Sequence, residues 1–252
     1  MLVKEYRPRS LWVLLSFALV VLAVLRSSDN SRLVFRTSST DLAVEANVFA
    51  AELRLRPGMT LCEMGSANGA LMTALAPSVM PGGKLVATSI ERAELEATAS
   101  ALRASGIDDT ALSVYLATDT EWAPGLPDGT CDALYSRMVI HMIPEPVILN
   151  YYIAQWARAL APGGLMFMTD HNPLDGTTTG PRKGMLSLGG FSFFMEVVPE
   201  ETEVAQITAS RFELEKGPFK HPFFSMGYGA VYRPRRQPAT TADPAIAVSA
   251  GL

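Results

Sequence analysis

Short apolar runs alternate with helical stretches along the middle of the chain. A stretch rich in Ala, Glu and Arg, residues 91–104, separates two of these runs. The runs themselves span residues 61–64, 84–90, 112–117, 131–136 and 165–169. Each is short enough for one buried strand, and strands alternating with helices at this spacing predict a parallel sheet with helices on both faces. We therefore expect a doubly wound α/β domain.

A glycine turn follows the first apolar run. Residues 61–71 read Leu-Cys-Glu-Met-Gly-Ser-Ala-Asn-Gly-Ala-Leu, so a strand with one carboxylate, Glu63, precedes Gly65 and Gly69. Glycine allows a tight turn and a close approach of ligand to backbone. The helix predicted after Gly69 directs its N-terminus at that ligand. A carboxylate in an apolar strand is costly to bury without a partner, which favours a functional role for Glu63.

Further motifs follow in a defined order. They are Glu63 to Gly69, Asp119 just past the third run, Leu126-Pro-Asp-Gly-Thr-Cys-Asp132 before the fourth, Val139-Ile-His-Met-Ile143, and Leu160-Ala-Pro-Gly-Gly164. Over residues 41–234 this series resembles the class I S-adenosylmethionine-dependent methyltransferases, with a type 11-like domain. The resemblance implies a Rossmann-like, doubly wound, seven-stranded and mostly parallel sheet. Its last two strands form an antiparallel hairpin, which residues 211–216 and 228–233 can supply.

The same resemblance implies S-adenosyl-L-methionine as cofactor and transfer of its methyl group to an acceptor. Glu63 would accept hydrogen bonds near the cofactor's ammonium group. The backbone that passes close to its methionine part would be that of Gly65, Ser66, Ala67 and Gly69. The other candidates for cofactor binding are Ser89, Ile90 and Glu91 at the end of the second run, Asp119 and Thr120 at the adenine, and Arg137 and Met138 at the pocket wall.

The chain departs from the family pattern at Ala67 and Ser89. Many members have a third glycine where Ala67 stands, and its methyl group narrows the approach to the ligand. Ser89 stands where an acidic residue usually accepts both ribose hydroxyls. Three interpretations stay open: Ser89 makes a weaker single contact, Glu91 reaches back in its place, or the cofactor is bound poorly or not at all.

Three residues are candidates for catalysis. Asp170 and His171 follow the fifth run, at the carboxyl end of a strand, where ligands gather in open α/β sheets. An imidazole there can act as a general base near neutral pH. His141 lies in an apolar run after the fourth strand, where a structural histidine is an equally good interpretation.

Composition narrows the class of partner. The formal net charge is −4, without a basic excess, so nucleic acid is not an expected substrate. The two cysteines, Cys62 and Cys131, lie in predicted buried strands and are interpreted as small core residues rather than a disulfide or a metal pair. No metal-ligand spacing occurs among the cysteines and histidines, so we expect no metal.

The N-terminus carries a separate apolar segment. Residues 11–25 are apolar apart from Ser16 and are flanked by basic residues. As a helix the segment would be about 22 Å long, against about 30 Å of hydrocarbon in a bilayer. Because no small-x-small cleavage site follows, we favour an uncleaved single-pass membrane anchor over a signal that leaves a secreted or organellar protein. Cofactor supply favours a catalytic domain that faces the cytosol or an equivalent compartment.

These observations give the expected organisation of the chain. It comprises an anchor or signal segment (1–30), a linker (31–40), a methyltransferase domain (41–234) and a disordered tail (235–252). Residues 172–190 predict a long substrate loop or lid without secondary structure. Its apolar far end, residues 191–195, together with the anchor, suggests a lipid-like acceptor.

Three functions from different classes stay open at this point. The first is a membrane-anchored methyltransferase that acts on a small molecule or lipid. The second is a non-catalytic protein that keeps the fold for binding. The third is a nicotinamide-dependent oxidoreductase, which is disfavoured because the turn lacks Gly-x-Gly-x-x-Gly spacing and Glu63 lies inside the strand.

Overall fold

The computed structural model describes residues 39–140, 143, 146–171, 182–188, 191–197, 207, 209, 211–220 and 227–235. The predicted anchor, the linker up to residue 38 and the tail after residue 235 lie outside these residues. The chain divides into two units, Met1–Val44 and Glu45–Leu252. Of the first unit, the described residues form only the start of helix α2 (Ser39–Glu52).

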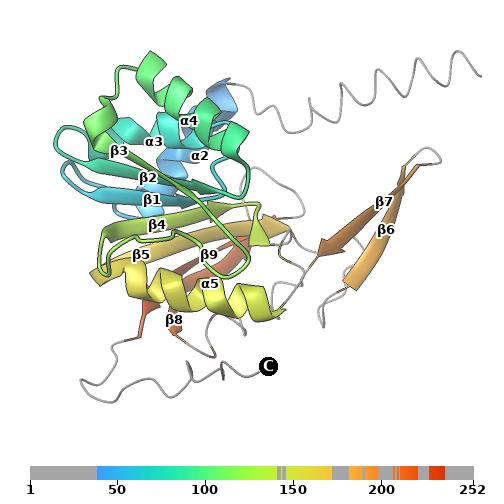
Figure 1. The fold of residues 1–252 in the computed structure, drawn as a ribbon. Coiled ribbons are helices and arrows are strands. Elements are labelled where there is room, and N and C mark those ends of the chain that lie inside the picture. The colour runs from blue at the N-terminus through green and yellow to red at the C-terminus, as the bar shows by residue number, and fades with distance from the viewer. Residues whose placement is uncertain are drawn as a thin grey trace, which may run out of the picture. The chain divides into compact units, whose positions relative to one another are not determined.

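Seven strands form one sheet in the order β3-β2-β1-β4-β5-β9-β8 (Figure 1). They are β1 (Thr60–Met64), β2 (Lys84–Ser89), β3 (Leu112–Leu116), β4 (Cys131–Arg137), β5 (Leu160–His171), β8 (Phe212–Lys220) and β9 (Gly227–Pro234). The first five are parallel, whereas β9 is antiparallel to both β5 and β8. The predicted Rossmann-like sheet with a C-terminal antiparallel hairpin is therefore confirmed.

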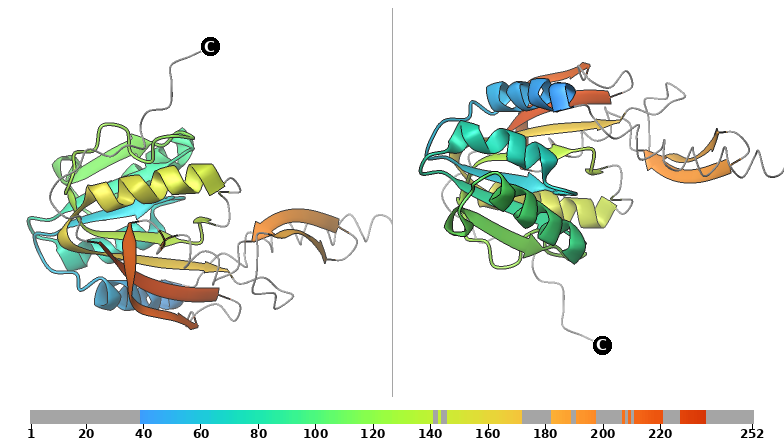
Figure 2. Two further views of the ribbon diagram at one scale, coloured as in Figure 1. Left: turned by 90° about the horizontal axis from the view of Figure 1, so that it is seen from below. Right: turned by 90° about the horizontal axis from the view of Figure 1, so that it is seen from above.

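Helices cover both faces of this sheet (Figure 2). Helices α3 (Ala70–Val79) and α4 (Arg92–Ala104) lie over one face, and α5 (Pro146–Ala159) lies over the other. The central strands are buried by both layers, which is why their sequences are nearly continuous apolar runs.

Aromatic side chains fill the core on both sides of β4. Trp156 of α5 is fully buried in the cluster that also holds Leu134 of β4. Phe49 of α2 meets Tyr135 of β4 edge to face at 5.5 Å and Phe167 of β5 at 4.7 Å, measured between ring centroids. Such pairs stabilise packing beyond the area that they bury. Helix α2 is thereby fixed to the middle of the sheet.

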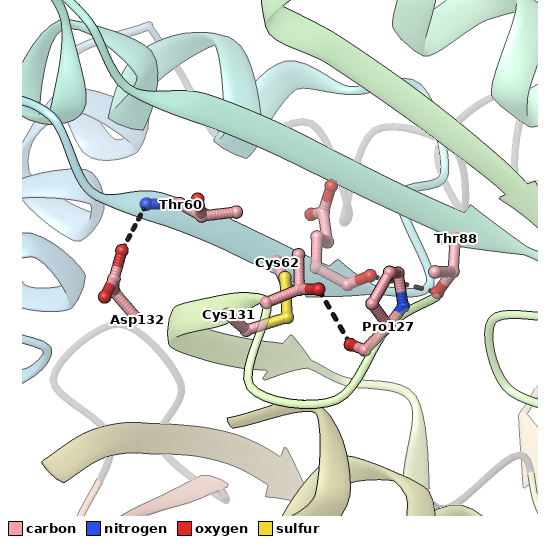
Figure 3. Close-up of a disulfide and its surroundings, with 8 residues drawn as sticks. Thr60, Cys62, Thr88, Pro127, Cys131 and Asp132 are labelled. Carbon is pink, nitrogen blue, oxygen red and sulfur yellow. Dashed lines mark hydrogen bonds between the residues drawn. A yellow bond between two sulfur atoms is a disulfide. The ribbon is translucent and has the colours of Figure 1, made fainter. Parts of the chain in front are cut away.

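The two cysteines form a disulfide, so their interpretation as unpaired core residues is wrong (Figure 3). Both are fully buried, as predicted. The strands β1 and β4 are neighbours, and this brings the Cα atoms of Cys62 and Cys131 to 5.8 Å although 69 residues separate them. That separation suits a disulfide. The bond ties together the two strands that carry Glu63 and Arg137.

The segment predicted to lack secondary structure also differs from expectation. Strands β6 (Arg182–Leu188) and β7 (Phe191–Val197) pair antiparallel as a separate two-stranded sheet. The sequence between them is Gly189-Gly190, and a glycine pair between two runs is typical of a hairpin turn. The sequence therefore held a signal for this hairpin, which the density of Gly and Pro in residues 172–190 obscured. Residues 172–181 lie outside the described residues.

Within the described part of the chain, no helix is both long and apolar enough to cross a membrane.

Candidate functional site

The register of the sheet brings the carboxyl ends of four strands to one edge. Met64 of β1 pairs with Thr88 of β2 and with Ser136 of β4, and Arg137 pairs with Thr169 of β5. Three strands thus end at one level, and β5 continues to His171. The predicted site residues at these strand ends therefore share one edge of the sheet, which is where ligands bind in open α/β folds.

The glycine turn is anchored to the next strand through Thr88. The N–H groups of Gly65 and Ser66 both donate to the Thr88 carbonyl, at 3.0 and 2.9 Å. The Thr88 hydroxyl donates to the Glu63 carbonyl at 2.9 Å. These bonds fix the backbone where β1 leads into the turn. Thr88 was not among the predicted residues, because a threonine in a strand is ordinary in sequence.

Both outer glycines are required by their surroundings. Gly65 and Gly69 have φ angles of 75° and 71°, in the left-handed region. A Cβ atom at Gly65 would lie 2.5 Å from Cγ2 of Val139, and one at Gly69 would lie 2.7 Å from the Cα atom of Thr98 in α4. Ala67 also adopts a positive φ, 46°, so the turn strains this residue where the family has glycine.

Glu63 is a buried acid with an unsatisfied oxygen. Its side chain is 4% exposed, and Oε2 has no hydrogen-bond partner among the described residues. Burial raises the pKa of the Glu63 carboxyl from 4.5 to about 8; the Tyr135 hydroxyl and the Arg137 guanidinium lower it, and the Glu94 carboxylate raises it further. The Tyr135 hydroxyl lowers the pKa of Glu63 through its proximity. Like Oε2 of Glu63, this hydroxyl has no hydrogen bond of ordinary geometry among the described residues.

The buried hydroxyl of Ser66 is also without a partner among the described residues. Buried polar groups without a hydrogen bond occur elsewhere among the described residues too, for example on Thr98 and Ser136, so their position decides whether they suit a ligand. Those on Glu63 and Ser66 lie at the start of the glycine turn. An acceptor and a hydroxyl in this place fit the ammonium and carboxylate of an amino-acid group, so the turn suits the methionine part of the implied cofactor.

At the end of β2, the structure adds a residue that sequence analysis missed. The Ser89 hydroxyl donates to Oε2 of Glu94 at 2.5 Å, and the backbone N–H of Glu91 donates to the Ser89 hydroxyl at 3.0 Å. Glu94 lies in the first turn of α4 and is half-buried, whereas the side chain of Glu91 is exposed. Acidic residues are common in the first turn of any helix, so the sequence did not single out Glu94. Ile90, the residue after Ser89, is 66% exposed.

The loop with Asp119 and Thr120 is fixed from two directions. The N–H of Ala117 donates to the Ser89 carbonyl at 2.8 Å, which joins the loop to the end of β2. From α5, Tyr152 and Gln155 donate to the carbonyl groups of Thr118 and Thr120, each at 2.6 Å. The side chains of Asp119 and Thr120 are exposed. Partial burial, followed by the charge of Asp119, raises the pKa of Tyr152.

Arg137 and Met138 follow β4 into the same edge. The Nε atom of Arg137 lies 2.7 Å from Oε1 of Glu45, a fully buried residue of α2. Met138 has a φ angle of 59°, and its N–H donates to the Thr169 carbonyl at 2.8 Å. Left-handed backbone in a residue other than glycine is concentrated at functional sites.

The candidate catalytic residues are placed only in part. Asp170 of β5 is buried and pairs with Tyr228 of β9. The backbone of His171 ends β5 opposite Gly227, but the His171 side chain and the whole of His141 lie outside the described residues. Among the described residues, no group of His, Cys, Asp and Glu side chains is arranged to hold a metal ion.

Comparison with known proteins agrees with this geometry. Residues 62–168 match the family described as a methyltransferase domain. The chain is 30% identical over 118 residues to nocamycin O-methyltransferase of Saccharothrix syringae. That match covers 47% of this chain and 40% of the relative, so the chain spans less than half of it.

Solved structures share the fold at low sequence identity. A S-adenosylmethionine-dependent methyltransferase from Clostridium acetobutylicum is 11% identical with a TM-score of 0.58, over 86% of this chain and 97% of the other. The [4+2]-cyclase SpnF is 17% identical with a TM-score of 0.57, over 72% and 61%. Residues 62–168 therefore match a methyltransferase domain, and the chain shares the Rossmann-like fold of solved methyltransferases. The resemblance seen in its sequence is thereby confirmed.

Proposed function

We propose that this protein is a S-adenosylmethionine-dependent methyltransferase that acts on a small-molecule or lipid-like acceptor. One observation carries the proposal: the glycine turn holds a buried carboxylate oxygen, on Glu63, and a buried hydroxyl, on Ser66, that lack partners among the described residues. The family match of residues 62–168 supports the same activity.

The chain's own residues would bind and orient the two reactants, because in-line methyl transfer needs mainly alignment and exclusion of water. When bound, the cofactor supplies a methyl group activated by a sulfonium centre. Glu63 would accept from its ammonium group, and Ser66 would donate to its carboxylate. The exposed apolar side chain of Ile90 would cover the adenine, with Asp119 and Thr120 at its edge.

Asp170 and His171 are the proposed groups for removing a proton from the acceptor. Both stand on β5 just past Thr169, the residue that pairs with Arg137 at the end of β4. An oxygen or nitrogen acceptor becomes a better nucleophile when such a group takes its proton. His141 stays a further prediction.

A lipid-like acceptor and membrane attachment are proposed from the sequence. The apolar segment 11–25 would anchor the chain, and residues 191–195 of β7 are strongly apolar. The disulfide bears on which side of the membrane the methyltransferase domain faces, since disulfides persist mainly in oxidising compartments. It therefore favours an orientation opposite to the cytosol-facing one expected from cofactor supply.

A second candidate is a protein that uses the methyltransferase fold for something other than methyl transfer. Ser89 in place of an acidic residue is the observation that favours it. The fold is compatible with other chemistry, since the [4+2]-cyclase SpnF has it. The nicotinamide-dependent oxidoreductase is not retained, because the antiparallel hairpin β8-β9 and the carboxylate inside β1 fit a methyltransferase instead.

A transfer assay tests the proposal. The full chain is incubated with methyl-labelled S-adenosylmethionine and either lipid or water-soluble extracts, beside a Glu63→Gln variant and the exposed control Asp109→Asn. With the cofactor below saturation, we expect labelled product from the wild type and the control, and at least tenfold less from Glu63→Gln. A folded protein that binds the cofactor but labels neither extract would support the second candidate. Label confined to water-soluble products would contradict the lipid-like acceptor.

A further inference from the structure

Ser89 is already committed to other groups of the chain. Its hydroxyl has one proton, and that proton is directed to Oε2 of Glu94. Its oxygen also accepts the N–H of Glu91. The Ser89 hydroxyl therefore has no proton to spare and one acceptor position left, so a ligand with two hydroxyl groups needs an acceptor from another residue.

Glu94 brings a carboxylate to that position from the neighbouring helix. A carboxylate offers about four acceptor positions, and the bond from Ser89 uses one of them. The same bond holds the Glu94 side chain at the carboxyl end of β2, and the first turn of α4 fixes its backbone. Glu91 is less suited, because its side chain is exposed.

A second carboxylate, that of Glu63, belongs to the same edge of the sheet. Glu94 is near enough for its charge to act on Glu63, whose Oε2 atom is buried and without a partner among the described residues. One carboxylate therefore stands beside the glycine turn and one beside the end of β2. A ligand with an ammonium group at one end and a vicinal diol further along would satisfy both.

We propose that Glu94, held by Ser89, accepts the hydrogen bonds of the two ribose hydroxyls of the cofactor. Glu94 thus replaces, from helix α4, the acidic residue that the family places at the end of the second strand. The inference rests on the proposed function. Ser89 is a positioning residue in this arrangement.

The test measures affinity for two probes by calorimetric titration of the full chain. The first probe is S-adenosylhomocysteine, and the second is its analogue without the two ribose hydroxyls. The proteins are the wild type, Glu94→Gln, Glu91→Gln and the control Glu96→Gln, an exposed residue of the same helix. Circular dichroism checks that each variant is folded.

We expect the wild type and Glu96→Gln to bind the first probe about 10- to 100-fold more tightly than the second, as for hydrogen bonds to a charged group. In Glu94→Gln the difference between the probes should fall to about threefold or less, because the amide is a poorer acceptor. Full discrimination by Glu94→Gln, its loss in Glu91→Gln instead, or no discrimination by the wild type would each overturn the proposal. Failure of the wild type to bind either probe would refute the proposed function itself.

Discussion

Replacing Glu63 by glutamine removes a buried acid while keeping the shape of the side chain. In the folded protein the pKa of this carboxyl is about 8, against 4.5 for the exposed group. The folded state therefore holds a proton that the unfolded state releases above pH 4.5. The contribution of this carboxyl to the free energy of unfolding is fully present below pH 4.5 and declines as pH rises to about 8. The buried carboxylate thus opposes folding at neutral and alkaline pH.

The magnitude follows from the two pKa values. Each unit of difference corresponds to about 1.4 kcal/mol, so the complete effect is about 5 kcal/mol above pH 8 and about 3 kcal/mol at pH 7. Glutamine does not titrate. The free energy of unfolding of Glu63→Gln minus that of the wild type should therefore increase by about 1.4 kcal/mol for each pH unit between 5 and 8.

Urea unfolding of both proteins at pH 5, 6, 7 and 8 measures this difference. Glu63→Gln should become the more stable protein as pH rises and yet bind S-adenosylmethionine at least tenfold more weakly, because its amide cannot pair with the ammonium group. Higher stability with lower affinity separates a ligand-binding acid from a structural one. A difference in stability that does not change with pH would show that burial does not raise the pKa of Glu63.

Three further predictions concern the same region. Ala67→Gly should raise the free energy of unfolding by about 0.5 to 1 kcal/mol in urea titrations, because glycine relieves the positive φ of 46° but adds freedom to the unfolded chain; a loss of stability would contradict this. Reduction of the Cys62–Cys131 disulfide should lower the free energy of unfolding by about 4 kcal/mol, as estimated for a loop of 69 residues. Two alkylatable thiols in the denatured, unreduced protein would show instead that the bond is absent. Binding of S-adenosylmethionine at pH 7 should release about one proton from Glu63, seen as a dependence of the calorimetric heat on buffer ionisation; identical heats in phosphate and Tris would count against it.

The parts of the fold that sequence predicted are those with a strong local pattern. The five parallel strands are apolar runs between helical stretches, and the turn at Gly65 and Gly69 needs a positive φ that glycine adopts most readily. Glu63 was recognised because an acid in a buried strand is costly.

The features that sequence missed depend on contacts between distant residues or on patterns with more than one meaning. The disulfide requires β1 and β4 to be neighbours, although 69 residues separate its cysteines. Glu94 resembles any acid in a first helical turn until its bond to Ser89 is seen. The strands β6 and β7 lie beside glycines and prolines that indicated a loop.

Calorimetric titration of the full chain with S-adenosylmethionine, for the wild type beside Glu63→Gln, tests the central claim most directly. We expect micromolar binding by the wild type at one site per chain and at least a tenfold loss in the variant, with both proteins folded. No binding by a folded wild type, or equal binding by the two proteins, would contradict the assignment of this turn as the cofactor site.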